Sequence, residues 1–315
     1  MTTPQDLLKR QLNFTNVSKY HEQGFTGKGI VVFNSESEKD DHGQMTNMVL
    51  KQFAPDVIIL NGTTSGRTSG NKVLEYYVTH NNVQYDFEEF IIRFNVKLMT
   101  TSLANSQANK ALQDYLKGVQ ERTGLIMFCA AGNEGSAGAD GKYVKNDTAI
   151  AVGAGVIREN GTVDITHYSA IDDEVDFIAP MGTGSGTSAA SPALTGMTAL
   201  LLQRYGDFNQ KECVEILKSI SMDIGIKGKD PKYGWGLPIL PLTDKLEILE
   251  KLRGENMDFK DVEQDRWSKN FIKMCVDAGL MQGYPDGTFK PGASVTREEL
   301  AVVLVRLLDK IEGRI

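Results

Sequence analysis

Short apolar runs that alternate with segments of helical length constrain the fold of this chain more than any other feature of its sequence. Near-continuous apolar runs of four to seven residues are typical of parallel strands that are covered on both faces. We expect six such strands: GIVVF (29–33), DVIIL (56–60), VKLMTTS (96–102), GLIMFCA (124–130), AIAVGA (149–154) and VDFIAP (175–180).

The segments between these runs have helical patterns. Residues 188–206 are apolar almost all round, which indicates a buried helix, and residues 209–220 form another helix candidate. Residues 107–123 are amphipathic, with one apolar side made by Ala111, Leu112, Tyr115, Leu116 and Val119. The alternation predicts an α/β fold: a doubly wound, mainly parallel sheet with helices on both faces.

Composition excludes several classes of partner and location. The net charge is −7 and no basic stripe is present, so we expect no nucleic-acid partner. No apolar run approaches the roughly 18–20 residues of a membrane span, so we expect no membrane partner. The 3 cysteines are far apart and residues 1–14 lack the apolar core of a signal peptide, which together favour a cytoplasmic location.

The composition changes near residues 238–257, where two prolines precede a charged, helical stretch. We therefore expect a main domain at 1–245, a linker or helix at 246–256, and a small unit at 257–315. The small unit carries its own turn signals, GYPDGTF and KPGAS.

Three motifs carry candidate chemistry. The glycine-rich loop of GTGSGTSAASPALTGM (182–197) places Ser188 at the start of the buried helix, where free N–H groups favour negative charge. Asn133 follows a strand in FCAAGNEGS (128–136) and could donate to an oxyanion. His42, in DHGQM, precedes a helix candidate. Taken singly, Ser188 could be a helix cap and Asn133 a turn residue.

Taken in order, these motifs resemble those of the subtilisin-like serine proteases, over about residues 15–245. GFTGKGIVVFNSE is similar to the strand that carries the catalytic aspartate, DHGQM to the histidine motif, and MTTSLAN to the substrate-binding strand. AAGNEG is similar to the oxyanion segment and GTSAASP to the serine motif. The resemblance implies a serine endopeptidase that acts on polypeptides, and it implies no cofactor.

The resemblance also assigns roles to single residues. Ser188 would be the nucleophile, His42 the general base and acid, and Asn133 an oxyanion donor together with the Ser188 N–H. The substrate backbone would pair with Ser102, Leu103 and Ala104, and the wall around the P1 side chain would include Ala130, Ala131 and Gly132. We identify no metal site; ESEKDD could hold a cation, and a structural calcium ion is left open.

The aspartate position departs from the family, because Asn34 occupies it. An amide brings no charge to stabilise an imidazolium, and in a trypsin-type triad this substitution lowers kcat about 10⁴-fold. The resemblance therefore implies weak activity, or alternatively an inactive pseudoprotease that binds peptides and assembles. Whether Asn34 is natural, introduced or deamidates to the acid is open at this point.

Three acidic residues close to His42 are alternatives to the missing aspartate. If the strand continues past Asn34, Glu36 faces the same side but lies roughly 6–7 Å further along. Asp40 and Asp41 adjoin His42 in sequence, and immediate neighbours rarely point back at the ring.

Residues 257–311 resemble a single S-layer homology module. The resemblance rests on FKDV, Trp267, AGLMQGYPDGTFKPGASVTREELA and Arg306. Such modules bind cell-wall polysaccharide, which makes Trp267 and Arg297 glycan-contacting candidates and cell-wall association the alternative location. A lone module could also self-associate. Thr296 and Glu299 predict a capping box, and the expected core stripe of the helix that follows is Leu300, Val303, Leu304 and Leu307.

Overall fold

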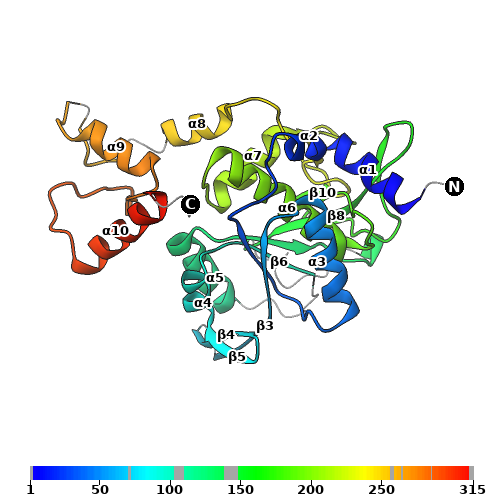
Figure 1. Cartoon of the computed structure of the whole chain (residues 1–315), viewed down its shortest axis with the longest axis horizontal. Coiled ribbons are helices and arrows are strands. Elements are labelled where there is room, and N and C mark those ends of the chain that lie inside the picture. Colours follow the sequence, from blue (N-terminus) through cyan, green and yellow to red (C-terminus); the bar gives the residue numbers. More distant parts are fainter. Residues whose placement is uncertain are drawn as a thin grey trace. The chain divides into compact units, whose positions relative to one another are not determined.

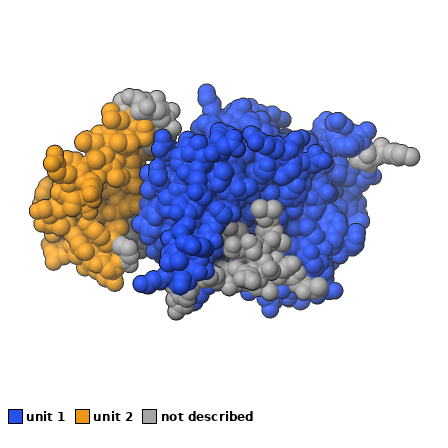
Figure 2. Space-filling view, turned by 90° about the horizontal axis from the view of Figure 1, so that it is seen from below, with its two compact units in different colours: residues 1–244 blue, residues 245–315 orange. Residues whose placement is uncertain are grey.

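The computed structural model describes residues 3–69, 72–102, 110–137, 148–255, 259–263, 265–284 and 286–311. The chain divides into two compact units, residues 1–244 and 245–315, which Figure 2 colours separately. Residues 246–256, expected as a linker, fall within the second unit.

A parallel sheet forms the centre of the first unit (Figure 1). Its strand order is β10-β8-β7-β6-β1-β2. Every pair along this path is parallel, and within the described residues β9 (Val163–Ile165) is the one antiparallel strand of this sheet, paired with β8. The fold is thus the predicted doubly wound α/β class. The six predicted strands are all present: β1 (Val31–Asn34), β2 (Ile58–Asn61), β6 (Val96–Thr101), β7 (Ile126–Ala130), β8 (Ile150–Ile157) and β10 (Phe177–Ala179).

The strand order reverses between β1 and β6. From β1 the chain moves outward to β2, and it then returns to the other side of β1 to form β6 and the strands beyond it. In open parallel sheets, ligands bind at the carboxyl ends of the strands beside such a reversal. Asn34 ends β1 and Ser102 directly follows β6, so both lie at this point of the sheet.

Helices cover both faces of the sheet. On one face α6 (Thr187–Tyr205) packs against β6, β7 and β8 and against α3 (Asp41–Phe53). On the other face lie α4 (Phe87–Arg93) and α5 (Lys110–Thr123), seen below the sheet in Figure 1. As predicted, α6 is buried from its first turn, and α5 buries its apolar side. The other helices of this unit are α1 (Pro4–Phe14), α2 (Val17–Glu22), η1 (Gly135–Ala137) and α7 (Gln210–Ile220).

An antiparallel sheet that no sequence pattern predicted is formed by the segment that joins β2 to α4. It consists of β3 (Thr63–Ser69), β4 (Lys72–His80) and β5 (Val83–Asp86), and a further small ladder pairs β11 (Ser221–Met222) with β12 (Leu237–Pro238). The β3 sequence TTSGRTS is polar and largely exposed, so it has no apolar pattern to detect. The β4–β5 turn does have a sequence signal, the pair Asn81 and Asn82, since a tight hairpin turn requires positive φ angles. Their φ angles are 50° and 63°.

The second unit contains α8 (Glu247–Glu255), α9 (Lys269–Asp277) and α10 (Arg297–Ile311). The capping box of α10 is confirmed: the Glu299 N–H donates to Thr296 Oγ1 (3.1 Å), and the Thr296 N–H donates to Glu299 Oε2 (2.7 Å). The predicted core stripe of α10 is wrong, since Leu300 is 46% and Leu304 50% exposed. A unit this small has too little chain to cover the whole helix.

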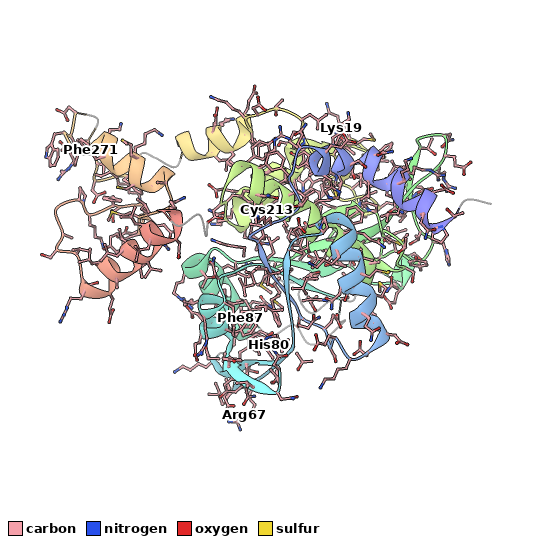
Figure 3. The ribbon with its side chains drawn as sticks, in the orientation of Figure 1. Lys19, Arg67, His80, Phe87, Cys213 and Phe271 are labelled. Atoms are coloured by element: carbon pink, nitrogen blue, oxygen red, sulfur yellow. The ribbon has the colours of Figure 1, made fainter. Side chains whose placement is uncertain are left out.

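The large apolar side chains at and before α9 are also mostly exposed. Ile272 is buried, whereas Trp267 is 83% and Phe271 62% exposed; Phe271 is labelled in Figure 3. Within the described part of the chain, no helix has both the length and the apolar character needed to cross a membrane.

Candidate active site

The loop before α6 presents Ser188 at the start of the helix. Gly186 is the N-cap with φ 78°, a left-handed conformation that favours glycine, and an added Cβ would lie 3.3 Å from Asn133 Oδ1. Ser188 is the second residue of the helix and makes no capping bond, so the interpretation of Ser188 as a helix cap is wrong. Among the described residues, the Ser188 N–H has no hydrogen-bond partner. It is therefore available to a ligand.

Asn133 is fixed beside Ser188 through its side-chain oxygen. The N–H and the hydroxyl of Thr187 both donate to Asn133 Oδ1, at 3.0 and 3.2 Å. These bonds join residues 54 apart in sequence, which rules out a merely local Asx turn. Within the described residues Asn133 Nδ2 has no hydrogen-bond partner, so it can donate together with the Ser188 N–H.

Pro192 and Ser102 together determine the environment of the Ser188 carbonyl. Pro192 lies inside α6 and has no N–H, so it cannot donate to the carbonyl of Ser188 four residues earlier. The hydroxyl of Ser102 donates to that carbonyl instead, at 2.9 Å. The end of β6 is thereby attached to the helix turn that carries the nucleophile.

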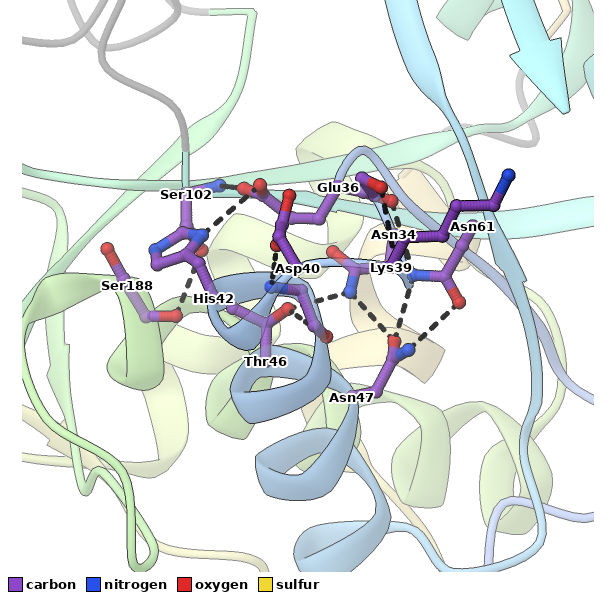
Figure 4. A network of polar contacts seen from close by, with 12 residues as sticks. Asn34, Glu36, Lys39, Asp40, His42, Thr46, Asn47, Asn61, Ser102 and Ser188 are labelled. Atoms are coloured by element: carbon purple, nitrogen blue, oxygen red, sulfur yellow. Dashed lines mark hydrogen bonds and ion pairs between the residues drawn. The ribbon is translucent and has the colours of Figure 1, made fainter.

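His42 reaches the same place from α3. Asp40 caps that helix by accepting a hydrogen bond from the Gly43 N–H at Oδ1 (2.7 Å), and no contact joins Asp40 to the imidazole among the described residues. Gly196 allows α3 and α6 to approach closely, because an added Cβ would lie 2.8 Å from the Cβ of Phe53. In Figure 4 the His42 ring lies between Glu36 and Ser188.

Glu36 is the carboxylate that contacts His42. Its Oε2 lies 3.3 Å from His42 Nδ1, and its Oε1 accepts the Ser102 N–H at 3.0 Å (Figure 4). The Glu36 side chain is only 3% exposed. Burial raises the pKa of the Glu36 carboxyl above its ordinary value, although His42 and the Ser102 N–H act in the opposite direction.

A tight turn explains how Glu36 comes within reach. The Ser35 N–H still donates to Thr100 O, but the Glu36 N–H donates back to Asn34 O at 2.8 Å. This bond between residues i and i+2 defines a γ-turn, a common way for a strand to end. The expectation that Glu36 would lie further along the strand assumed that β1 continues, whereas the chain folds back at Ser35.

The Asn34 side chain lies in a network of amides, which is linked to Glu36 by the hydrogen bond from Asn61 Nδ2 to the Glu36 backbone carbonyl, at 3.3 Å. Its Nδ2 donates to Thr46 Oγ1 (2.9 Å) and to Asn47 Oδ1 (2.8 Å), and Asn47 in turn exchanges hydrogen bonds with Asn61. The Asn34 Oδ1 atom is buried without a hydrogen-bond partner. No hydrogen bond joins Asn34 to His42 among the contacts of the described residues.

Of the residues expected to bind substrate, some are partly exposed, one is buried, and two are outside the described part of the chain. Ser102 lies at the end of β6, while Leu103 and Ala104 are outside the described residues. Ala131 is fully buried in the apolar core. The remaining expected residues of the P1 wall, Ala130 and Gly132, are partly exposed.

Two cysteines and His80 also have side chains that could react, but their contacts are those of packing residues. Burial raises the pKa of the Cys129 and Cys213 thiols, which keeps both protonated and inert (Cys213 is labelled in Figure 3). His80 packs against Phe90. Within the described ranges, no three His, Cys, Asp or Glu side chains form a group that could hold a metal ion.

Comparison with known proteins identifies both units. Residues 29–236 match the subtilase family, which is about two thirds of the chain. The chain belongs to the subtilase family. Residues 258–301 match the S-layer homology domain.

Individual relatives of this subtilase match only in part. Minor extracellular protease Epr of Bacillus subtilis is 29% identical over 161 residues, which are 47% of this chain and 24% of Epr. The cellulosome-anchoring protein of Acetivibrio thermocellus is 39% identical over 59 residues, 19% of this chain and 13% of that protein. The chain therefore spans at most about a quarter of the length of either relative.

Solved structures show the same fold at low identity. Fervidolysin from Fervidobacterium pennivorans has a TM-score of 0.57 and 16% identity, and the match covers 76% of this subtilase and 45% of fervidolysin. The prenylagaramide maturation protease PagA has a TM-score of 0.53 and 17% identity, covering 74% and 98% of the two chains. These likenesses concern the fold alone.

Proposed function

We propose that this subtilase is a serine endopeptidase that cleaves polypeptides by acyl transfer through Ser188. One observation carries the proposal: Thr187 holds the Asn133 Oδ1 atom, and neither Asn133 Nδ2 nor the Ser188 N–H has a hydrogen-bond partner among the residues that the structure describes. Two fixed donors beside a nucleophile are what a developing oxyanion needs. If Asn133 served packing alone, its Nδ2 group would not need to lie unpartnered, among the described residues, beside the Ser188 N–H.

The reaction would proceed in two balanced halves. Ser188 Oγ attacks the peptide carbonyl carbon while its proton passes to His42, and the resulting oxyanion accepts hydrogen bonds from Asn133 and the Ser188 N–H. The C–N bond then breaks as His42 gives the proton to the leaving amine. Water attacks the acyl-enzyme in the same way, which releases the acid and restores Ser188.

The substrate would bind as an extended strand beside Ser102 and the residues that follow it. Backbone pairing of this kind accepts many sequences, since the main chain supplies the hydrogen bonds. Ala130 and Gly132, both small and partly exposed, would border the P1 side chain and leave room for an apolar residue of some size.

A non-catalytic peptide-binding protein is the second candidate function. It is favoured by the amide at the family's acid position, Asn34, and by the lack of a hydrogen bond between His42 and Ser188 among the described contacts. Such bonds are often loose before substrate binds, so this geometry alone does not decide between the two functions.

Covalent labelling distinguishes the two candidates. The wild-type chain and Ser188→Ala are incubated with an alkyl fluorophosphonate, and separately with an unfolded polypeptide. The endopeptidase proposal predicts labelling of Ser188 and cleavage by the wild-type chain only. If the wild-type chain shows neither reaction while it still binds the unfolded polypeptide, the second candidate holds.

We also propose that the second unit attaches the protein to the cell surface by binding wall polysaccharide. This location replaces the expected cytoplasmic one, which finds no support in the comparisons. Trp267 supports the proposal because it exposes 83% of its surface, as a ring that stacks on a sugar must. Arg297 is exposed at the start of α10.

Co-sedimentation with purified wall polysaccharide tests this attachment. Trp267→Ala and Arg297→Ala should each reduce the bound fraction several-fold, whereas Lys310→Ala, at the far end of the same helix, serves as the matched control. Equal sedimentation of all four chains, or none by the wild-type chain, would refute the proposal.

A further inference from the structure

We propose that Glu36, rather than the residue at the family's acid position, is the carboxylate that orients His42. The proposal rests on the endopeptidase function above and deepens it. It makes Glu36 a positioning residue, one that acts on the reaction through the imidazole. It also removes the reason for expecting weak activity.

Both oxygens of Glu36 are engaged in a way that suits this role. Oε2 faces His42 Nδ1 at 3.3 Å, so the Nδ1–H donates to it and leaves the other ring nitrogen free to take the proton of Ser188. Oε1 is held by the Ser102 N–H at 3.0 Å. The two contacts fix the carboxylate from both sides in a nearly water-free position.

Ser102 connects the acid to the nucleophile. Its backbone N–H holds Glu36, and its hydroxyl holds the carbonyl of Ser188. Glu36, which contacts His42, and Ser188 are therefore both bonded to one residue at the end of β6. A buried carboxylate with no part in the reaction would have no need for this link to the nucleophile.

Asn34 occupies a site that suits an amide better than a carboxylate. Its Nδ2 faces two oxygen acceptors, Thr46 Oγ1 and Asn47 Oδ1. The hydroxyl of Thr46 already donates to Gly43 O, so it has no second hydrogen to offer. With Thr46 and Asn47 in these orientations, a carboxylate at position 34 would place oxygen against oxygen at both contacts, so the site as it stands is arranged around the Nδ2 group of Asn34.

The neighbouring acids are excluded by their own contacts or positions. Asp40 is committed to the α3 N-cap and acts on Glu36 only as a nearby like charge. Asp41 and Glu38 are exposed. Glu36 is thus the one carboxylate in the described part of the chain that contacts the imidazole.

Peptide hydrolysis by matched variants tests the proposal. Glu36→Gln keeps the shape and the acceptor for the Ser102 N–H but removes the charge, and Glu38→Gln makes the same change at an exposed position two residues away. By analogy with amide substitution in a trypsin-type triad, Glu36→Gln should lower kcat about 10²- to 10⁴-fold with little change in KM. Glu38→Gln should stay within about twofold of the wild-type chain.

Two further measurements separate positioning from folding. Glu36→Asp keeps the charge on a shorter side chain, so it should retain more activity than Glu36→Gln. The rate at which a fluorophosphonate labels Ser188 should also fall in Glu36→Gln, because labelling needs His42 to take the proton of Ser188 but needs no peptide substrate. A merely structural role would lower the folded fraction, measured by urea unfolding, and leave the labelling rate of the folded chain unchanged.

The outcomes separate this proposal from the function on which it rests. If the wild-type chain hydrolyses peptides and Glu36→Gln matches it in kcat, or if Ser188 of Glu36→Gln is labelled as fast as in the wild-type chain, Glu36 does not orient His42 and the endopeptidase function stands. If the wild-type chain neither hydrolyses peptides nor labels at Ser188, both proposals fail.

Discussion

At the scale of single residues, burying the Glu36 carboxylate costs free energy of folding, and the fold tolerates this cost. A carboxylate that is 3% exposed loses most of its hydration, and two contacts recover only part of it. Burial, the largest influence, raises the Glu36 pKa, His42 and the Ser102 N–H lower it, and the charge of Asp40 raises it further. The native state therefore binds a proton at Glu36 more tightly than the unfolded chain does.

This raised pKa predicts how stability depends on pH. The contribution of Glu36 to folding is fully present below its unfolded pKa, and it is lost as the pH rises through the higher folded pKa. Glu36→Gln is neutral at every pH, so its stability relative to the wild-type chain should increase from acidic to neutral pH. Urea unfolding of both chains across this range measures the difference; a difference that shrinks as the pH rises would contradict the assignment.

At the scale of elements, the site depends on how closely α3 approaches α6. His42 is on the first helix and Ser188 on the second, and their contact includes Gly196, which faces Phe53 and the carbonyl of Leu50. Since packed cores do not deform freely, an added methyl group must move one helix relative to the other. The separation of base and nucleophile would change with it.

Gly196→Ala should therefore lower both stability and activity. We expect a loss of about 1–3 kcal/mol of unfolding free energy from overpacking and a lower kcat. Gly118→Ala in α5 is the control, because the atoms nearest to its added Cβ belong to the end of the Arg122 side chain rather than to a packed core, and alanine should stabilise a helix interior by about 0.5–1 kcal/mol. Thermal unfolding and peptide hydrolysis report both effects; a Gly196→Ala chain as stable and active as the wild type would show that the helices tolerate the shift.

Helices and strands could be predicted from the sequence where their burial requires a recognisable pattern of apolar residues. The central strands were visible because both of their faces are covered, and α6 because it is apolar all round. The β3–β4–β5 sheet was missed because β3 is polar and mostly exposed. Ser188 and Asn133 could be found from their motifs, but the contact of Glu36 depends on a γ-turn at Ser35, which no apolar pattern records.

At the scale of the whole molecule, the second unit leaves an unusual amount of apolar surface open. Val302, Leu304, Val305 and Leu308 on α10 are each between 47% and 56% exposed. Contiguous apolar surface of this kind marks an interaction site in soluble proteins. Another molecule of the same protein carries the same α10 surface, which makes it a candidate partner.

Self-association through α10 is the corresponding prediction. Light scattering after size exclusion should show a mass that rises with concentration for the wild-type chain, and Leu304→Lys should reduce it. Lys310→Ala, already used as the control for polysaccharide binding, should not. A monomer at every concentration would exclude association through this helix.

The central claim is that Glu36 has replaced the residue at position 34 as the partner of His42. The rate at which a fluorophosphonate labels Ser188 in Asn34→Asp, relative to the wild-type chain, tests it most directly. If Asn34 cripples the triad, restoring the carboxylate should speed labelling by up to about 10⁴-fold. We predict no gain, since Glu36 already fills the role; a large gain would show that the family's acid position is still the one that matters.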